Sequence, residues 1–245
     1  MIAWDDIGII LGRKRFGETD LIVTALTREH GRHAGLVKGG VSRRMRGELE
    51  PGSRVTLSWR ARLDEHLGSF RHEGAAAVPV AVLEHPARLA ALVSACALLD
   101  LALPEREPHP ELYALAGELL DRLESGDWAA VYADFERGLL EALGFGLRLD
   151  ACAVTGAAEG LRWVSPKTGC AVSEAAGAAW AARLLPFPEV FRRTGIASYE
   201  DVVAGLGVTG YFLERHVLDG RGFPEARGRL IERLSKARVG NDENG

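Results

Sequence analysis

The chain has 245 residues, of which 47% are hydrophobic and 26% are charged, and its formal net charge is −4. This composition is ordinary for a globular protein and excludes a disordered or fibrous chain. The charge is uneven: residues 1–72 hold thirteen basic and nine acidic residues, or +4, whereas residues 73–245 hold seventeen and twenty-five, or −8.

Three features of the sequence predict a cytoplasmic protein that does not enter membranes. No stretch approaches the roughly 18 uninterrupted apolar residues that a membrane span requires. Residues 1–6 carry two acids where a secretory signal would carry basic residues. The three cysteines, Cys96, Cys152 and Cys170, are too few for a disulfide framework, which favours a reducing compartment.

The first 75 or so residues have the period-two pattern of β-strands. Apolar residues alternate over 7–11 and again over 55–59, and residues 21–27 are rich in β-branched side chains. Glycine-containing turns separate these runs, as at 16–20 and 51–52. Four or five short strands punctuated in this way predict a small closed barrel.

A basic segment lies between two of these strands. From Arg28 to Arg46 there are six basic residues and one acid, Glu29, and a glycine-bounded loop is expected over residues 39–47. A local basic region on an acidic chain is typical of a surface that binds a polyanion such as nucleic acid. The alternative is that these are ordinary solvated turn residues.

Four aromatic residues, Trp4, Phe16, Trp59 and Phe70, are interleaved with the basic strands. If they are exposed on a barrel face, their rings can stack on bases. If they are buried, they belong to the core, which the phase of Trp59 with Val55 favours.

After residues 79–86 the apolar period changes to about 3.6. Leucine-rich stripes over 89–99 and 112–123 predict two helices, and a third is expected to begin after Asp127 and end at residues 144–146. Helices are expected again up to about Leu234, starting from a capping-box-like sequence at Ser198. The polar end of the chain, residues 237–245, is predicted to be disordered.

The segment 150–173 has the spacing of a zinc knuckle. Cys152 and Cys170 each begin a C-x-x-C-like unit, but Thr155 and Ser173 stand at the second position of each. Because structural zinc requires four thiolate or imidazole ligands, we expect no zinc here and no other cofactor.

No catalytic motif is convincing, so the sequence predicts a protein that is not an enzyme. Residues 205–210 match G-x-G-x-x-G, but the motif requires a preceding strand and a βαβ unit, and the surrounding pattern is helical. Close helix packing explains these glycines better than nucleotide binding. The histidines show no pair or acid partner at catalytic spacing.

The chain resembles the family of the bacterial DNA repair protein RecO. The resemblance is dense over the first 60 residues and weaker over the helical part, including residues 139–145 and the degenerate knuckle. Its most specific residues are Gly8-Ile9-Ile10-Leu11, Arg15-Phe16-Gly17-Glu18-Thr19-Asp20-Leu21-Ile22-Val23, Gly31, Gly35-Leu36-Val37-Lys38-Gly39 and Leu49-Glu50-Pro51-Gly52.

The resemblance implies an α+β multidomain fold: an N-terminal OB-fold over residues 1–78 and an all-α helical domain over 79–236. The helical domain contains the zinc-knuckle-like insertion at 150–173, without a full ligand set. Relatives with four cysteines bind zinc there, and this chain departs from them.

The resemblance also implies a recombination mediator. Such a protein binds single- and double-stranded DNA, anneals complementary strands and helps to load RecA onto DNA coated with single-strand-binding protein. The implied partners are RecR and the C-terminal tail of single-strand-binding protein, with RecA indirectly, and the implied location is the nucleoid.

Basic residues on the barrel are the candidate DNA-binding residues, since they neutralise phosphates without reading sequence. A scaffold whose basic rim binds an acidic protein is the alternative function. The candidates are Arg13, Lys14, Arg15, Arg32, Lys38, Arg43, Arg44 and Arg46, of which Lys14 is expected to point away from Arg13 and Arg15.

Overall fold

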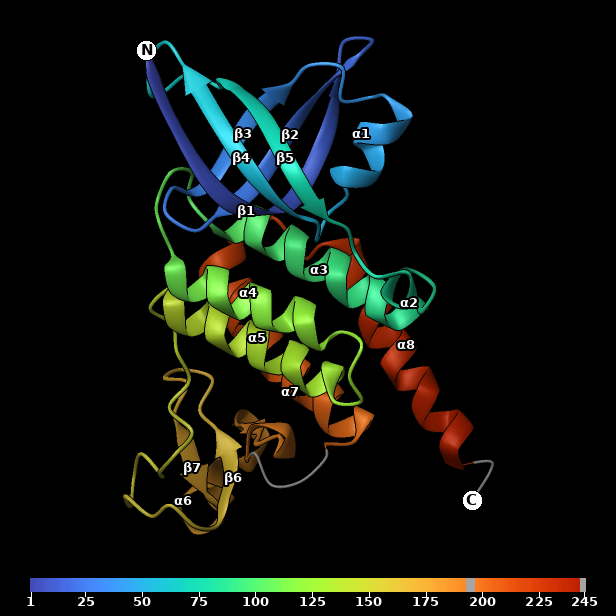
Figure 1. Ribbon diagram of the computed structural model, residues 1–245. Helices are drawn as coiled ribbons and strands as arrows, with labels where there is room; N and C mark the ends of the chain where they lie inside the picture. Colours follow the sequence, from blue (N-terminus) through green and yellow to red (C-terminus); the bar gives the residue numbers. More distant parts are fainter. Residues whose placement is uncertain (193–196, 243–245) are drawn as a thin grey trace. The chain divides into compact units, whose positions relative to one another are not determined.

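The computed structural model describes residues 1–192 and 197–242, except for the side chains at positions 44, 46 and 238–242 (Figure 1). Two compact units form: Met1–Glu124 with Pro224–Ala226, and Ser125–Phe223 with the chain from Arg227 onward. The first unit therefore includes helices beyond the barrel. The predicted domain boundary after residue 78 follows the last barrel strand and stays a prediction.

A closed five-stranded barrel forms the start of the first unit (Figure 1). The strand order is β1-β2-β3-β5-β4, and β4 pairs with β1 to close the barrel. All the pairs are antiparallel except β3 with β5. This is the predicted OB-fold. The strands are β1 (Ile2–Phe16), β2 (Asp20–Thr27), β3 (Gly31–Val37), β4 (Arg54–Ala61) and β5 (Ser69–Ala76).

The period-two pattern places one face of each strand inside the barrel. Val55, Leu57 and Trp59 of β4 are almost fully buried, and Phe70 of β5 packs in the same core. The Trp59 indole donates to the Leu67 carbonyl at 3.1 Å, so its one polar atom is satisfied. The interpretation of Trp59 and Phe70 as core residues is confirmed.

The basic segment between β3 and β4 is not entirely a loop. It contains helix α1 (Arg43–Glu48), where the sequence predicts a loop over 39–47. Arginine and methionine are good helix formers, and the helix is anchored by Met45, which packs against the barrel core, and by buried Leu49. The bounding glycines alone favour a loop, but Met45 and Leu49 supply the apolar contacts that stabilise a helix.

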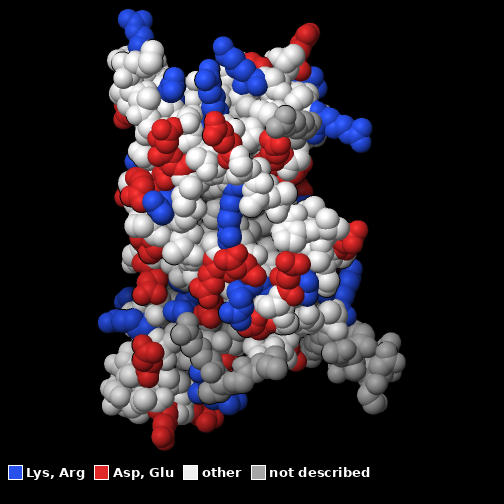
Figure 2. Space-filling view, in the orientation of Figure 1, with Lys and Arg blue, Asp and Glu red and all other residues white. Residues whose placement is uncertain are grey.

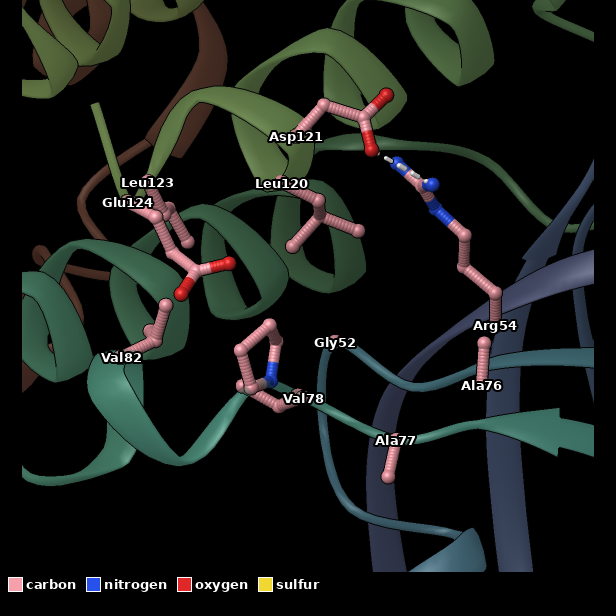
Figure 3. Close-up of a pocket in the computed structure, with 11 residues that line it drawn as sticks. Gly52, Arg54, Ala76, Ala77, Val78, Val82, Leu120, Asp121, Leu123 and Glu124 are labelled. Atoms are coloured by element: carbon pink, nitrogen blue, oxygen red, sulfur yellow. Dashed lines mark ion pairs between the residues drawn. The ribbon is translucent and has the colours of Figure 1, made fainter.

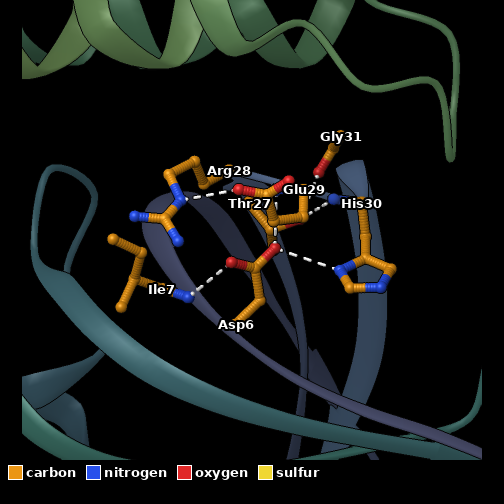
Figure 4. Close-up of polar contacts among 7 residues, drawn as sticks. All are labelled: Asp6, Ile7, Thr27, Arg28, Glu29, His30 and Gly31. Atoms are coloured by element: carbon orange, nitrogen blue, oxygen red, sulfur yellow. Dashed lines mark hydrogen bonds and ion pairs between the residues drawn. The ribbon is translucent and has the colours of Figure 1, made fainter.

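A buried carboxylate holds the β2–β3 turn against β1 (Figure 4). Asp6 accepts hydrogen bonds from the backbone N–H of Ile7 and of Glu29, both at 2.8 Å, and lies 3.0 Å from Nδ1 of His30. Gly31 ends this turn at a φ of +68°, and a Cβ there would lie 2.0 Å from the Glu107 carbonyl oxygen. The turn therefore requires glycine.

Three helices complete the first unit: α2 (Val80–Leu83), α3 (Pro86–Ala102) and α4 (Pro110–Arg122). Helix α3 packs against β1, where Ile9 and Leu11 are buried outside the barrel core while Ile10 faces into it. The strand is therefore covered on both sides, which explains why its apolar run is nearly continuous.

The second unit contains the helices predicted after Asp127 and from Ser198 and, in addition, a small sheet. Ser198 caps α7 in a complete capping box with Asp201, as the sequence predicts. Strands β6 (Leu161–Val164), β7 (Ala171–Ser173) and β8 (Leu185–Pro186) form a three-stranded sheet in the order β7-β6-β8. The other elements are α5 (Trp128–Ala142), α6 (Glu174–Gly177), η1 (Ala178–Arg183), η2 (Glu189–Arg192), α7 (Tyr199–Leu213), the π-helical η3 (Glu214–Leu218) and α8 (Glu225–Asp242).

A buried ion pair joins α8 to α5. The Arg227 guanidinium donates twice to the Glu136 carboxylate, at 2.7 and 2.9 Å, and also to the Leu206 carbonyl. The Thr209 hydroxyl donates to the same carboxylate. Helix α8 then continues to Asp242, so the prediction of disorder from residue 237 is wrong as far as 242. Residues 243–245 lie outside the described chain. Polar composition misled that prediction, because a helix that is anchored at one end can extend through polar residues.

Among the described residues, none of the helices combines the length and the apolar character needed to cross a membrane.

Candidate nucleic-acid interface

The three basic residues of β1 lie on two faces of the strand. Arg13 pairs in register with Val23, which is buried in the barrel core, and Arg15 pairs with Leu21. Lys14 pairs with Ile22, whose side chain is on the outer side. The expectation that Lys14 points away from its two neighbours is therefore confirmed.

Lys14 belongs to an exposed patch on the outside of the barrel, here called the outer strand face: Lys14, Phe16, Ile22, Leu36 and Lys38. The strand registers align Lys14 with Ile22, and Ile22 with Leu36. Lys14 and Lys38 are exposed, while Ile22 and Leu36 are half-buried between them. In the described part of the chain neither lysine forms an ion pair. The patch combines free ammonium groups with an apolar floor.

Phe16 supplies an exposed ring at the end of β1. It is 53% exposed, whereas Trp59 and Phe70 are buried and Trp4 is partly buried against the core. Trp4 also stacks on His30 with a centroid separation of 4.1 Å. Of the four aromatic residues considered from the sequence, Phe16 is the one placed to stack on a base.

The Asp20 carboxylate fixes the loop that carries Lys38. It accepts the Gly39 N–H at 2.9 Å and the Thr19 hydroxyl at 2.9 Å, and these hydrogen bonds lower the pKa of Asp20. The Val41 N–H donates to the Thr19 carbonyl at 3.0 Å. The β1–β2 turn and the segment after β3 are thereby held together, which sets the position of Lys38.

A groove beside the outer strand face contains a cation that sequence reasoning missed. Its volume is about 500 Å³, and it lies between the end of β3, helix α1 and β5. Lys38 and Arg71 line it together with Met45, Glu48 and His72. Arg71 is brought there by the parallel pairing of β3 with β5, a long-range contact that no local pattern indicates. Arg71 is exposed and forms no ion pair with a described residue.

Two of the predicted DNA-binding residues are held by the protein's own carboxylates. Arg13 pairs with Glu50. Arg32 pairs with Asp100 at 2.9 Å and with Glu105 at 3.3 Å, and its side chain is only 19% exposed. A guanidinium already paired in this way has little charge left for a phosphate. The structure therefore does not group these two with the free lysines.

The other predicted residues differ in how much of them is described. Arg15 is exposed and donates to the Glu18 carbonyl at 2.9 Å, which leaves its charge uncompensated. Arg43 is exposed on α1. Arg44 and Arg46 occupy the same helix, but their side chains lie outside the described residues.

Lys and Arg side chains project from the barrel at the top of the view in Figure 2. A different cleft of about 180 Å³ lies between the barrel and α4, and it holds no free cation among the residues described (Figure 3). Its one arginine, Arg54, pairs with Asp121 at 2.8 Å and donates to the Gly117 carbonyl. That cleft is a poor candidate for binding phosphate.

The knuckle-like segment is held by hydrogen bonds to its two sulfurs. The Ser173 N–H donates to the Cys152 sulfur at 3.2 Å, and hydrogen bonds from Ser173 and Thr155 lower the pKa of the Cys152 thiol to about 6. The Arg148 guanidinium lies 3.1 Å from the Cys170 sulfur. The hydroxyl residues that replace cysteines thus satisfy the sulfur rather than a metal.

These residues do not fit a four-ligand zinc site. Among the described residues, no group of three or more His, Cys, Asp and Glu side chains is placed to hold a metal ion. The absence of zinc from the functional protein stays a prediction.

The glycines of the G-x-G-x-x-G sequence lie inside helix α7. A Cβ at Gly205 would lie 2.6 Å from Val190, and a Cβ at Gly210 would lie 2.8 Å from Arg227, while Gly207 faces open space. Among the described residues, the element before α7 is the short helix η2, and not the strand that the dinucleotide motif requires. Close packing accounts for two of the three glycines.

Comparison with known proteins matches both parts of the chain. Residues 1–76 match the family model described as "Recombination protein O N terminal", and residues 83–222 match "Recombination protein O C terminal". The chain belongs to the RecO family. The RecO resemblance seen in the sequence is thereby confirmed.

Curated relatives are similar over almost their whole length. The "DNA repair protein RecO" of Rhodospirillum centenum is 49% identical over 240 residues, which cover 96% of both chains. The RecO protein of Cereibacter sphaeroides is 47% identical, over 97% of this chain and 100% of its own length. The RecO protein of a Ruegeria species is 46% identical, over 95% of this chain and 98% of its own length. A place in DNA repair and recombination, with partners from that pathway, follows from the family.

Proposed function

We propose that this protein is a recombination mediator that binds single- and double-stranded DNA through the outer strand face of its barrel. It anneals complementary strands and helps RecA to replace single-strand-binding protein, with RecR and the tail of single-strand-binding protein as partners. The role is binding rather than catalysis. The observation that carries the proposal is that exposed, unpaired Lys14 and Lys38 share the outer strand face with the exposed ring of Phe16, while Arg71 lines the adjoining groove with Lys38.

The chemistry of this surface suits a strand of any sequence. Ammonium and guanidinium groups neutralise phosphates and release counterions without reading base edges. A phenyl ring stacks on any base. Mobile contacts of this kind hold a strand while leaving its Watson–Crick edges free, which annealing requires.

The number of free cations sets the expected salt dependence. If Lys14, Lys38, Arg43 and Arg71 each contact one phosphate of a single strand, affinity falls by roughly 50-fold between 50 and 200 mM salt. Arg13 and Arg32 are left out, because their charges are compensated within the protein.

The test is the combined variant Lys14→Ala, Lys38→Ala and Arg71→Ala. We expect it to bind a 30-nucleotide single strand about 10- to 50-fold more weakly near 150 mM salt, with the slope of log affinity against log salt reduced by about two. It should also anneal oligonucleotides coated with single-strand-binding protein more slowly. Fluorescence anisotropy and an annealing assay across a salt series measure both effects.

The matched control replaces two exposed arginines of the second unit, Arg215→Ala and Arg233→Ala, and should leave DNA affinity unchanged. Undiminished DNA binding by the triple variant would overturn the assignment. If that variant instead loses binding to an acidic polypeptide, the surface is that of a protein scaffold.

A further inference from the structure

A second region of the molecule combines arginines with aromatic rings, between β6 and η2 of the second unit. Within residues 162–192 three guanidinium groups lie over aromatic rings: Arg162 over Trp163 and Arg183 over Trp180, each at 5.8 Å, and Arg192 over Phe187 at 4.6 Å. Significant cation–π pairs occur about once per 70–80 residues, so three in this stretch is a concentration. These six residues are here called the Arg–aromatic surface.

Trp180 is the exposed member of this surface. It is 58% exposed on η1, and its neighbours Ala179 and Ala182 are exposed as well. A large ring left open to solvent on a short helix of small residues contributes nothing to the core. An exposed ring of this size is available to stack on a base.

A cleft lined by arginine and aromatic side chains lies on the same sheet. It has a volume of about 410 Å³ and is lined by Arg162, Trp163 and Phe187, among others. The Nε1 of Trp163 is buried and has no hydrogen-bond partner among the described residues. Trp163 itself is held in place because its ring packs on Gly177, where a Cβ would come within 2.4 Å. The guanidinium and aromatic groups that line the cleft favour a ligand with acceptor oxygens and flat rings.

The charge of this region differs from that of the rest of the unit. Residues 160–192 contain four basic and two acidic residues, whereas residues 73–245 as a whole are strongly acidic. The two acids are paired: Glu174 lies 3.6 Å from Arg162, and Glu189 lies 2.9 Å from Arg192. Arg183 forms no ion pair with a described residue. The region therefore presents net positive charge to a polyanion.

We infer that the Arg–aromatic surface is a second contact for single-stranded nucleic acid, with a base stacked on Trp180 and a phosphate on Arg183. Base–aromatic stacking and arginine contacts to the backbone are the two features by which proteins hold single strands without sequence preference. This inference extends the proposed function, since a protein that anneals DNA has to hold two strands. It assigns the second strand to residues outside the OB-fold.

The first test is Trp180→Ala in the full-length protein, measured with a 30-nucleotide oligo(dT). We expect roughly five- to tenfold weaker binding, the lower part of the range for loss of one stacked base, and restoration by Trp180→Phe. Arg183→Ala should show a weaker effect and a smaller salt slope. Because Trp180 and Arg183 are exposed, neither variant should unfold the protein. Val154→Ala and Arg215→Ala, exposed residues elsewhere in the unit, are the matched controls.

Tryptophan fluorescence gives an independent readout. Oligo(dT) should quench the fluorescence of the wild-type protein, and Trp180→Phe should reduce that quenching, since Trp180 is 58% exposed whereas Trp4 and Trp163 are half-buried and Trp59 and Trp128 are buried. Equal quenching in both proteins, or unchanged affinity of Trp180→Ala, would overturn the inference. So would a loss of binding to an acidic peptide with oligo(dT) binding retained, which would indicate a protein-docking surface.

The outcome is separable from that of the proposed function. If the Lys14/Lys38/Arg71 variant binds DNA more weakly and Trp180→Ala binds it normally, the barrel surface is supported and the second contact is refuted. The reverse result refutes the barrel surface and supports the second contact.

Discussion

The two ends of strand β3 use positive charge in opposite ways. At its beginning, Arg32 is held between Asp100 and Glu105 and is mostly shielded from solvent. At its end, Lys38 is exposed and belongs to the outer strand face. The two residues are six positions apart, and nothing in the local sequence distinguishes one basic residue from the other. We therefore expect a basic residue to bind DNA only where the fold leaves its charge uncompensated.

The paired arginines are expected to stabilise the fold, and the unpaired cations are expected to bind. The three predictions below test that division, from the largest change in free energy to the smallest.

The largest effect is expected at the buried pair of Arg227 and Glu136. Arg227→Ala leaves the Glu136 carboxylate buried without its partner, so the free energy of unfolding should fall by about 3–5 kcal/mol. Urea unfolding followed by circular dichroism measures it. The double variant Arg227→Met and Glu136→Leu removes both charges and should recover most of the loss. A change below about 1 kcal/mol in the single variant would show that paired arginines do not stabilise this fold.

His33 is buried inside the barrel, so its protonation should destabilise the folded protein. It is surrounded by the rings of Trp4, Trp59 and Phe70, and burial lowers its pKa to about 4. The unfolded chain, with a histidine pKa near 6.5, binds a proton that the folded protein excludes. The free energy of unfolding should therefore have its full value above about pH 6.5. It should fall by up to about 3 kcal/mol as the pH drops toward 4.

Urea unfolding at several pH values measures this loss. His33→Phe should reduce the pH dependence between 4 and 6.5, and a mutant with the wild-type slope would assign the effect to other groups. Neighbouring charges also act on this imidazole: Arg106 and His30 disfavour its protonation, while Asp64 and Glu105 favour it.

The smallest change in free energy is expected for Arg32→Gln, which is compared with Lys38→Gln. Loss of its two partly exposed ion pairs should lower the free energy of unfolding by about 0.5–1 kcal/mol and leave DNA affinity and its salt slope unchanged. Lys38→Gln should do the opposite, weakening DNA binding with stability constant within about 0.5 kcal/mol. Fluorescence anisotropy measures the DNA affinity of both variants, and urea unfolding measures their stability. Equal losses of DNA affinity in the two variants would contradict the proposed difference between Arg32 and Lys38.

Much of the fold could be predicted because its signals are local. The alternation of Val55, Leu57 and Trp59 predicts a half-buried strand, and Ser198 with Asp201 predicts the start of α7, since both depend on residues close in sequence. Helix α1 was missed because its anchor, Met45, packs against a core that the segment itself does not contain. The extent of α8 was missed because its stability begins at Arg227, through a partner 91 residues away.

The candidate site was predictable only in part. The positions of Lys14 and Lys38 follow from strand alternation and from the basic segment. The neutralisation of Arg32 depends on Asp100, which α3 brings to it from 68 residues further along the chain. Arg71 joins Lys38 because β3 pairs with β5, and Phe16 stands apart from the other three rings because it lies at the exposed end of β1.

The sequence by itself determined the family, the five-stranded barrel followed by helices, and the basic character of the first 72 residues, because periodicity, turn residues and composition are local properties. The tertiary structure decided which cations are free, which rings are exposed, and that Arg183 lies over the exposed ring of Trp180. The physical reason is that compensation of a charge and burial of a ring depend on neighbours in space, and those neighbours come from distant parts of the chain.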